Sequence, residues 1–163
     1  MNARSALLLA VLLSLAGCVS LDDTFGVTPF LREQITGDTW RACLAREYQV
    51  QTRVVLREGR DWAKASRFSA KGWAALRNET VEPWEVSAFE VGERRRANLT
   101  RGRRDLQAAL ANKEAAPCSC AKAQGAFDGW LAASARLGAN EEALAKNYAD
   151  AAASCRQGMT GAR

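Results

Sequence analysis

Histidine is absent from this chain of 163 residues, and only three prolines and two methionines are present. Histidine is the commonest general base and the commonest metal ligand, so its absence disfavours most hydrolase, oxygenase and zinc chemistries. Apolar residues make up 48% and charged residues 25% of the chain, which excludes an acidic disordered tail and a polytopic membrane protein. Alanine occurs 32 times, and this excess of the strongest helix former favours an all-α fold of one small domain.

Residues 1–17 have the pattern of an export signal. Arg4 supplies the positive charge, residues 6–16 are apolar apart from Ser14, and a small residue, Gly17, stands before Cys18. This apolar run is too short to span a bilayer, because a membrane-spanning helix needs about 20 residues. The sequence therefore predicts that residues 1–17 are cleaved off.

The run Leu15-Ala16-Gly17-Cys18 resembles a bacterial lipobox, in which the cysteine is acylated and becomes the first residue of the mature chain. The alternative is an ordinary secretory signal with a chance cysteine. A lipidated cysteine of this kind carries several acyl chains, and each buried methylene contributes about 0.8 kcal/mol to membrane binding. No aspartate follows Cys18, which by resemblance to the sorting signals of enteric bacteria favours the cell outer membrane, with the domain facing the periplasm.

Residues 18–37 are interpreted as the lipidated N-terminus and a flexible tether. They contain Thr, Asp, Gly and Pro without a sustained apolar period. A flexible segment of this length has an end-to-end distance of about 25 Å. We therefore expect the folded domain to stand away from the lipid surface.

Residues 38–163 are predicted to form a small antiparallel bundle of about five helices. The apolar residues recur at three- and four-residue spacing, and Asp38, Asp61 and Asn140 precede helical runs in capping positions. The expected helices cover about 38–59, 61–76, 92–112, 117–138 and 140–155. Between the second and third helices, residues 78–91 contain Pro83, Trp84 and Phe89 without a clean period, which indicates an ordered loop packed by its aromatic side chains.

Four cysteines, Cys43, Cys118, Cys120 and Cys155, remain after the predicted lipid carrier. An exported domain with an even number of thiols is expected to form disulfides. If the last two helices pair about a turn at residues 138–140, Cys155 lies within one turn of Cys120, which favours that bridge and leaves Cys43 and Cys118 for a second. A four-thiolate metal site is the alternative, disfavoured by the Cys-x-Cys spacing. We therefore expect no metal and no cofactor.

Six arginines fall within one stretch of eleven residues on the third expected helix. They are Arg94, Arg95, Arg96, Arg101, Arg103 and Arg104. Guanidinium groups bind phosphate and carboxylate groups in pairs of hydrogen bonds, so these arginines are candidates for binding a polyanion. In a bacterial envelope that polyanion would be lipopolysaccharide, anionic lipid or peptidoglycan, and nucleic acid is not an expected partner. The alternative is a solvated helix face partly neutralised by Glu90, Glu93 and Asp105.

Signals of enzymatic function are weak. Ser119 and Lys122 match the Ser-x-x-Lys spacing of penicillin-binding proteins, but none of the accompanying motifs follows. Asp61 and the pair Glu141 and Glu142 stand where helix capping and the helix dipole favour an acid. The sequence therefore predicts no catalytic residues.

Several runs together resemble the helical N-terminal region of alphaproteobacterial OmpA-like lipoproteins. They are Glu47-Tyr48, Asp61-Trp62, Ala65, Phe68, Lys71, Leu99, Arg103, Leu106, Ala109, Leu110 and the run from Ala121 to Trp130. In that family the region follows a lipidated cysteine and precedes a peptidoglycan-binding domain. The chain departs from the family in having Gly129 where a cysteine is common, and the peptidoglycan-binding domain is expected to be missing because the sequence ends at Arg163.

Taken together, these patterns predict a non-enzymatic lipoprotein of the bacterial cell envelope. Its disulfide-stapled helical bundle would act as a structural or interaction module, with the membrane bound through Cys18 and an envelope protein, peptidoglycan or lipopolysaccharide as a further partner. The alternative function is recognition of lipopolysaccharide or peptidoglycan as a polyanion through the arginine-rich helix.

Overall fold

The computed structural model of the chain describes residues 21–135 and 141–160. In these ranges the fold is all-α, with six α-helices, two short 3-10 turns and no strand. The elements are α2 (Leu21–Arg32), α3 (Trp40–Gly59), α4 (Trp62–Leu76), η1 (Val86–Ala88), α5 (Glu93–Leu110), η2 (Lys113–Ala115), α6 (Pro117–Ser134) and α7 (Glu141–Thr160). The predicted signal peptide, Cys18 and the expected turn at residues 138–140 lie outside the described residues.

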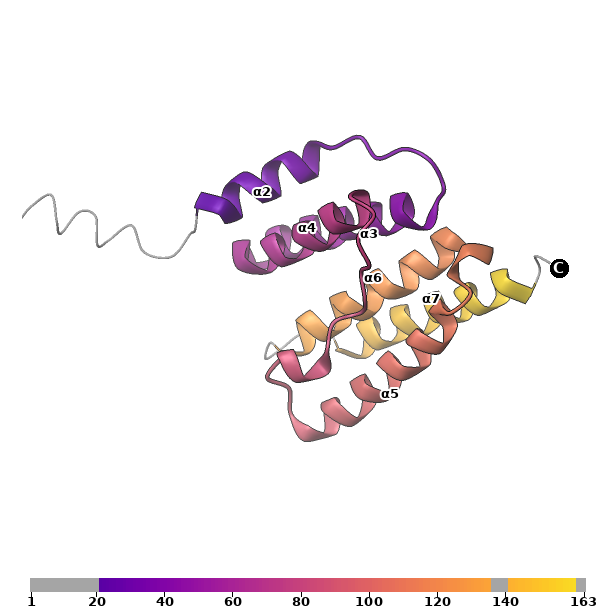
Figure 1. The fold of residues 1–163 in the computed structure, drawn as a ribbon. Coiled ribbons are helices and arrows are strands. Elements are labelled where there is room, and N and C mark those ends of the chain that lie inside the picture. The colour runs from indigo at the N-terminus through magenta and orange to yellow at the C-terminus, as the bar shows by residue number, and fades with distance from the viewer. Residues whose placement is uncertain (1–20, 136–140, 161–163) are drawn as a thin grey trace, which may run out of the picture.

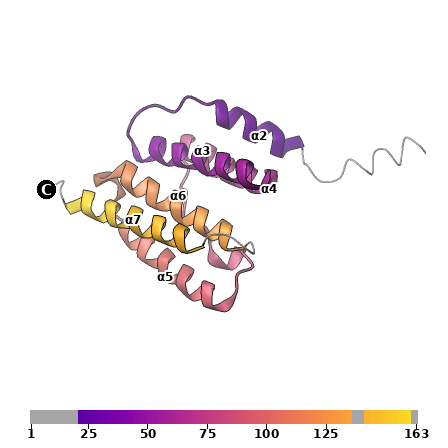
Figure 2. The same cartoon turned by 180° about the vertical axis from the view of Figure 1, so that it is seen from behind.

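The helices form two layers of three. Helices α2, α3 and α4 make one layer, and α5, α6 and α7 make the other (Figure 1). The two layers meet where α3 packs against α6. Seen from behind, the same two groups remain separate, with the segment between α4 and α5 crossing from one layer to the other (Figure 2). The predicted helical bundle is therefore confirmed.

Local sequence signals place the helix ends. Asp61 caps α4, since its Oδ1 accepts a hydrogen bond from the backbone N–H of Lys64 at 2.9 Å. Thr39, and not the expected Asp38, caps α3, and its Oγ1 accepts from the N–H of Ala42 at 3.4 Å. Pro117 opens α6 at the first helical position, where its missing N–H costs no hydrogen bond.

From α3 onward the core is built from the apolar stripes that the periodicity indicated, and α2 adds Val27 and Phe30. The largest fully buried apolar side chains of the core are Val27, Phe30, Leu44, Tyr48, Phe68, Leu99, Leu106, Phe127 and Leu131. On α7 the inner stripe includes Tyr148, Ala151, Ala152 and Cys155, all of them buried. Among the described residues no helix is both long enough and apolar enough to cross a membrane.

Both predicted cysteine pairs are disulfides in the structure. Cys120 and Cys155 join α6 to α7 with their Cα atoms 4.5 Å apart. Cys43 and Cys118 join α3 to α6 with their Cα atoms 4.9 Å apart. One bridge therefore fixes the α6–α7 pair, and the other links the two layers.

The structure differs from the expected tether over residues 21–37, because α2 is a packed helix. Val27 and Phe30 are fully buried against the rest of the molecule. The side chain of Gln49 on α3 donates hydrogen bonds to the carbonyl oxygens of Phe30 at 2.6 Å and Glu33 at 2.9 Å, at the end of α2. Val27 and Phe30 lie one helical turn apart, which is too short a pattern to predict a helix from the sequence. Their burial is enough to hold α2 in place because α4 offers a surface into which Phe30 fits.

That receiving surface depends on Gly72 of α4. A Cβ atom built on Gly72 would lie 1.9 Å from Cζ of Phe30, so the ring occupies the space that any other residue would fill. A glycine inside a helix normally destabilises it by about 1 kcal/mol relative to alanine. Here that cost is offset by burial of the Phe30 ring.

We predict that Gly72→Ala destabilises the protein, although alanine is the better helix former. The added methyl group collides with Phe30, so the free energy of unfolding should fall by about 1 to 3 kcal/mol, the usual cost of overpacking. In a Phe30→Ala background the collision is absent, and the same substitution should stabilise by about 1 kcal/mol. Urea denaturation of the four variants measures both effects, and the same sign in both backgrounds would contradict this account of α2.

Candidate functional site

The six arginines do not form a single patch on α5. Arg94 and Arg101 are exposed, and they lie seven residues apart on the same side of the helix. Arg95 instead faces α7, where its Nε pairs with Glu141 at 2.6 Å and its Nη1 donates to the carbonyl oxygen of Ser134 at 3.1 Å. The prediction of one six-arginine surface is therefore corrected, because the helical period distributes the side chains around α5.

The other three arginines, Arg96, Arg103 and Arg104, share one groove between α5 and η1. The groove has a volume of about 370 Å³ and is also lined by Glu85, Val86, Ser87, Thr100 and Gln107. Three guanidinium groups, two hydroxyl groups and one amide give it many hydrogen-bond donors. Their clustering makes this groove the best candidate for binding an anionic group.

Arg103 is held in place within this groove. Its Nε donates to the carbonyl oxygen of Trp84 at 3.0 Å, and its Nη2 donates to that of Pro83 at 3.3 Å. The guanidinium also pairs with Glu85, and its Nη1 donates to Oε1 of Gln107 at 3.1 Å. Because these contacts fix the side chain before any ligand arrives, little side-chain entropy remains to be lost on binding.

A buried polar network holds the loop that positions Arg103. Asp128 on α6 is fully buried. Its Oδ2 accepts from Nζ of Lys71 at 2.5 Å and from the hydroxyl of Tyr48 at 2.7 Å, and its Oδ1 accepts from the backbone N–H of Trp84 at 2.9 Å. Lys71 also donates to the carbonyl oxygen of Glu82 at 2.7 Å. One carboxylate therefore links α3, α4, α6 and the segment before η1.

Burial dominates the ionisation of this network. It raises the pKa of Asp128, although the nearby Lys71 ammonium acts in the opposite direction. It also lowers the pKa of Lys71, although Asp128 opposes this shift. Burial, with the charge of Asp128, raises the pKa of Tyr48 well above its ordinary value, so the phenol remains a hydrogen-bond donor. The pair links helices α4 and α6, and its attraction and hydrogen bonds oppose the cost of removing the Asp128 carboxylate from water.

The aromatic side chains of the loop support the same arrangement. The ring of Trp84 lies 4.6 Å from that of Phe68 and 5.2 Å from that of Phe89, measured between centroids. The guanidinium of Arg67 lies 4.8 Å from the centre of the Trp84 ring. The expectation of an ordered loop packed by its aromatic residues is thus confirmed, and Trp84 is used inside the protein.

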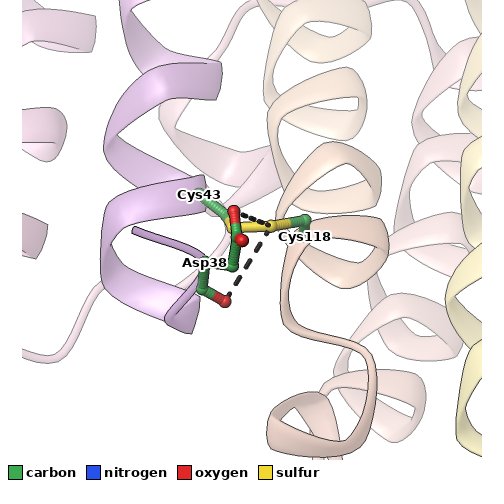
Figure 3. Close-up of side chains that lie close together, drawn as sticks. All are labelled: Asp38, Cys43 and Cys118. Atoms are coloured by element: carbon green, nitrogen blue, oxygen red, sulfur yellow. Dashed lines mark hydrogen bonds between the residues drawn. A yellow bond between two sulfur atoms is a disulfide. The ribbon is translucent and has the colours of Figure 1, made fainter. Parts of the chain in front are cut away.

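The Cys43–Cys118 disulfide borders a second polar cluster. Ligand atoms of Asp38, Cys43 and Cys118 lie within 4.8 Å of one another. Figure 3 shows Asp38 beside the disulfide, with its backbone oxygen and its Oδ1 each 3.9 Å from Sγ of Cys118. Nη2 of Arg46 lies 3.3 Å from Sγ of Cys43. The four cysteines are paired in two disulfides, so they offer no set of four thiolates to a metal ion.

The acids considered as catalytic candidates have structural partners. Asp61 caps α4 and pairs with Nζ of Lys64 at 3.0 Å. Glu141 begins α7, where its carboxylate pairs with Arg95. Both positions agree with the capping and dipole interpretation of the sequence.

The buried network was not identified from the sequence. Lys71 and Asp128 are 57 residues apart, and each lies among apolar residues of a helix, where a charge needs a partner. A charged residue on an otherwise apolar helix face was the available signal. All of Tyr48, Lys71, Gln124 and Asp128 belong to the runs that resemble OmpA-like lipoproteins, but the resemblance did not indicate that they touch.

Comparison of the chain with protein-family models, with curated proteins and with solved structures finds no match. The function proposed below therefore rests on the residues and geometry of this chain.

We predict that Lys71→Met destabilises the protein by about 3 to 5 kcal/mol at pH 7, because it leaves the Asp128 carboxylate buried without its cation. Adding Asp128→Asn should recover part of this loss, since the amide oxygen still accepts from Trp84. Lys64→Met removes a partly exposed ion pair instead and should cost less than about 1 kcal/mol. Urea denaturation measures all three values.

The pH dependence of Lys71→Met follows from the raised pKa of Asp128. A carboxyl group whose pKa is higher in the folded than in the unfolded state favours folding in its protonated form, and that contribution is lost as pH rises through the folded pKa. The variant should therefore become more stable, relative to the native chain, as pH falls from 7 towards the pKa of an unfolded aspartate. A constant difference across this range would show that Asp128 does not carry the uncompensated charge.

Proposed function

We propose that this protein is a non-enzymatic lipoprotein of the bacterial cell envelope. The Leu15–Cys18 run carries the proposal, because it matches a lipidation signal directly before a folded domain. Two disulfides support export, since paired cysteines persist in oxidising compartments. Acyl chains on Cys18 would fix the domain at the outer membrane, on its periplasmic side, and the helical domain would contact an envelope partner.

Lipidation has a direct test. Mass spectrometry of the protein purified from a bacterial envelope should show a mature N-terminus at Cys18 with covalently bound acyl chains. Cys18→Ser should abolish both the processing and the acylation, while both disulfides still form because Cys18 takes no part in either. An intact leader, or a free thiol at Cys18, would contradict the proposal.

A second function, recognition of an anionic envelope component, is supported by the groove that contains Arg96, Arg103 and Arg104. A phosphate or carboxylate group there would accept hydrogen bonds from guanidinium groups that the fold already orients. Glu85 lies in the same groove with an exposed carboxylate, so an entering anion would compete with it for Arg103. Lipopolysaccharide phosphates and peptidoglycan carboxylates both have this chemistry.

We predict that the position of the arginines, and not their number, determines this binding. The double variant Arg96→Gln/Arg104→Gln removes two charges from the groove and should weaken binding to lipopolysaccharide-containing vesicles or to peptidoglycan by about tenfold, or about 1.4 kcal/mol. Its matched control, Arg94→Gln/Arg101→Gln, removes two exposed charges that do not line the groove and should change binding less than about twofold.

Both variants keep Arg103, whose hydrogen bonds hold the loop at Trp84, so neither is expected to disturb the fold. Binding is measured at low and at high salt by co-sedimentation. Equal weakening by the two variants would indicate attraction to the overall charge and would contradict a role for the groove. Unchanged binding in both variants would show that binding does not depend on these arginines, which also contradicts a role for the groove.

A further inference from the structure

The two disulfides differ in their exposure to solvent. Cys120 and Cys155 are fully buried, so their bridge lies inside the α6–α7 pair. In the other bridge Cys43 is also buried, at 3% exposure, but Cys118 is only partly buried. A thiolate that approaches from the solvent is therefore expected to react at Cys118 before it reaches the other three cysteines.

Arg46 places a cation beside both sulfur atoms of the Cys43–Cys118 bridge. Its Nη2 lies 3.3 Å from Sγ of Cys43 and 3.8 Å from Sγ of Cys118. Its Nη1 donates to the carbonyl oxygen of Gly37 at 2.6 Å and to that of Ile35 at 3.3 Å, so the guanidinium is held in place. A neutral disulfide gains little from a fixed cation, whereas a thiolate released at the same position is stabilised by it.

The backbone adds to this stabilisation, because both cysteines lie near the start of a helix. Cys43 is the fourth residue of α3, and Cys118 is the second residue of α6. The N-terminus of a helix carries a partial positive charge, which favours a thiolate within the first turn. The surroundings of this bridge therefore suit the reduced pair of cysteines as well as the oxidised one.

Asp38 is the acidic group beside this bridge (Figure 3). Its backbone oxygen and its Oδ1 are each 3.9 Å from Sγ of Cys118. A disulfide sulfur carries no proton, but a Cys118 thiol can donate to either oxygen. The carboxylate opposes an approaching thiolate, and this repulsion is reduced by solvent and by the ion pair with Arg46, whose Nη2 lies 3.4 Å from Oδ1.

We propose that the Cys43–Cys118 disulfide is a thiol–disulfide exchange site that takes two electrons from the dithiol of a partner protein. One thiolate of that dithiol attacks Sγ of Cys118, the S–S bond breaks, and Cys43 leaves as a thiolate beside Arg46. The second thiolate of the dithiol then attacks the sulfur joined to Cys118, so the dithiol becomes a disulfide and Cys118 is released. Of the two protons that the dithiol gives up, Cys118 takes one, and the other goes to water while Cys43 stays ionised.

The reaction opens a covalent link between the two layers without removing the contacts that pack them. Helices α3 and α6 remain in contact, and the hydrogen bond from Tyr48 to Asp128 still joins them. We therefore expect the reduced domain to stay folded, which allows the bridge to close again. The site involves neither Cys18 nor the arginine groove, so it holds or fails independently of the proposed function.

The first test compares the two bridges in the full processed chain. Thiols outside the disulfides are blocked, reduced thioredoxin is added in native buffer, and the reaction is stopped with acid before maleimide labelling. Tryptic digestion places Cys43 and Cys155 in separate peptides, so each label reports one bridge. Cys43 should be labelled at least about tenfold faster than Cys155, with the circular dichroism unchanged.

Several results would overturn the proposal. Equal labelling of Cys43 and Cys155, no label on Cys43, or loss of helical circular dichroism on reduction would each show that the bridge is only a structural link. Reduction by dithiothreitol but not by thioredoxin would exclude a protein as the source of the electrons. Glutathione tests the direction of attack, because its mixed disulfide should form on Cys118 and leave the label on Cys43, and the reverse pattern would overturn attack at Cys118.

The role of Arg46 has its own variants. Arg46→Gln removes the cation beside the departing thiolate and should slow reduction about threefold to tenfold, whereas Arg46→Lys keeps the charge and should slow it less. Arg41→Gln is the matched control and should change the rate less than about twofold, because Arg41 is exposed on the same helix. Among the described residues, Arg46 and Asp38 are the charged groups that approach the sulfur atoms.

The direction of the Arg46→Gln effect separates an electrostatic role from a merely structural one. If Arg46 only held residues 35–37 over the bridge, its loss would expose the sulfur atoms and speed their reduction. Slower reduction with an unchanged Cys120–Cys155 bridge is the result expected here. Faster reduction, or equal effects of Arg46→Gln and Arg41→Gln, would overturn the role of the guanidinium.

Discussion

The contacts of one buried carboxylate, that of Asp128, hold the two layers of this protein in register. Its two oxygens accept from Lys71 on α4, from Tyr48 on α3 and from the backbone of Trp84 between α4 and α5. Removing a carboxylate and an ammonium from water costs more than their mutual attraction returns, which is why burial governs the direction of both pKa shifts. The arrangement persists because each of these groups has hydrogen-bond partners, and removing one group would leave the others without theirs.

The arginine groove depends on this network. The N–H of Trp84 is held by Asp128 and its carbonyl oxygen accepts from Arg103, so the position of the arginine groove follows from that of the carboxylate. Gln124 lies one helical turn before Asp128 on α6 and donates to the same Tyr48 hydroxyl, so its amide belongs to the same buried network. A change in the network should therefore alter the groove, although the groove does not contain Asp128.

The sequence predicted the local features well and the long-range pairings only where topology constrained them. Helical periodicity located most of the inward stripes, and the expected pairing of the last two helices brought Cys155 opposite Cys120. Asp128 and Lys71 offered no comparable constraint, because they lie on helices of different layers whose relative placement no local pattern specifies. Helix α2 was missed for a related reason: its docking depends on a space left by Gly72, and a missing side chain leaves no apolar signal.

The number of arginines on α5 does not give the size of a binding surface, because the helical period places them on different sides of the helix. Arg94 and Arg101 are seven residues apart and share one side of α5, while Arg96 and Arg103, also seven apart, share another that faces the loop at residues 83–87. Of these four arginines, Arg103 is the one that this loop holds, since the loop supplies two carbonyl oxygens and a carboxylate to it. Charge on the exposed side is screened by salt and remains mobile, whereas charge held in a groove acts with defined geometry. We therefore propose that recognition of an anionic group occurs on the side of α5 that the buried network organises.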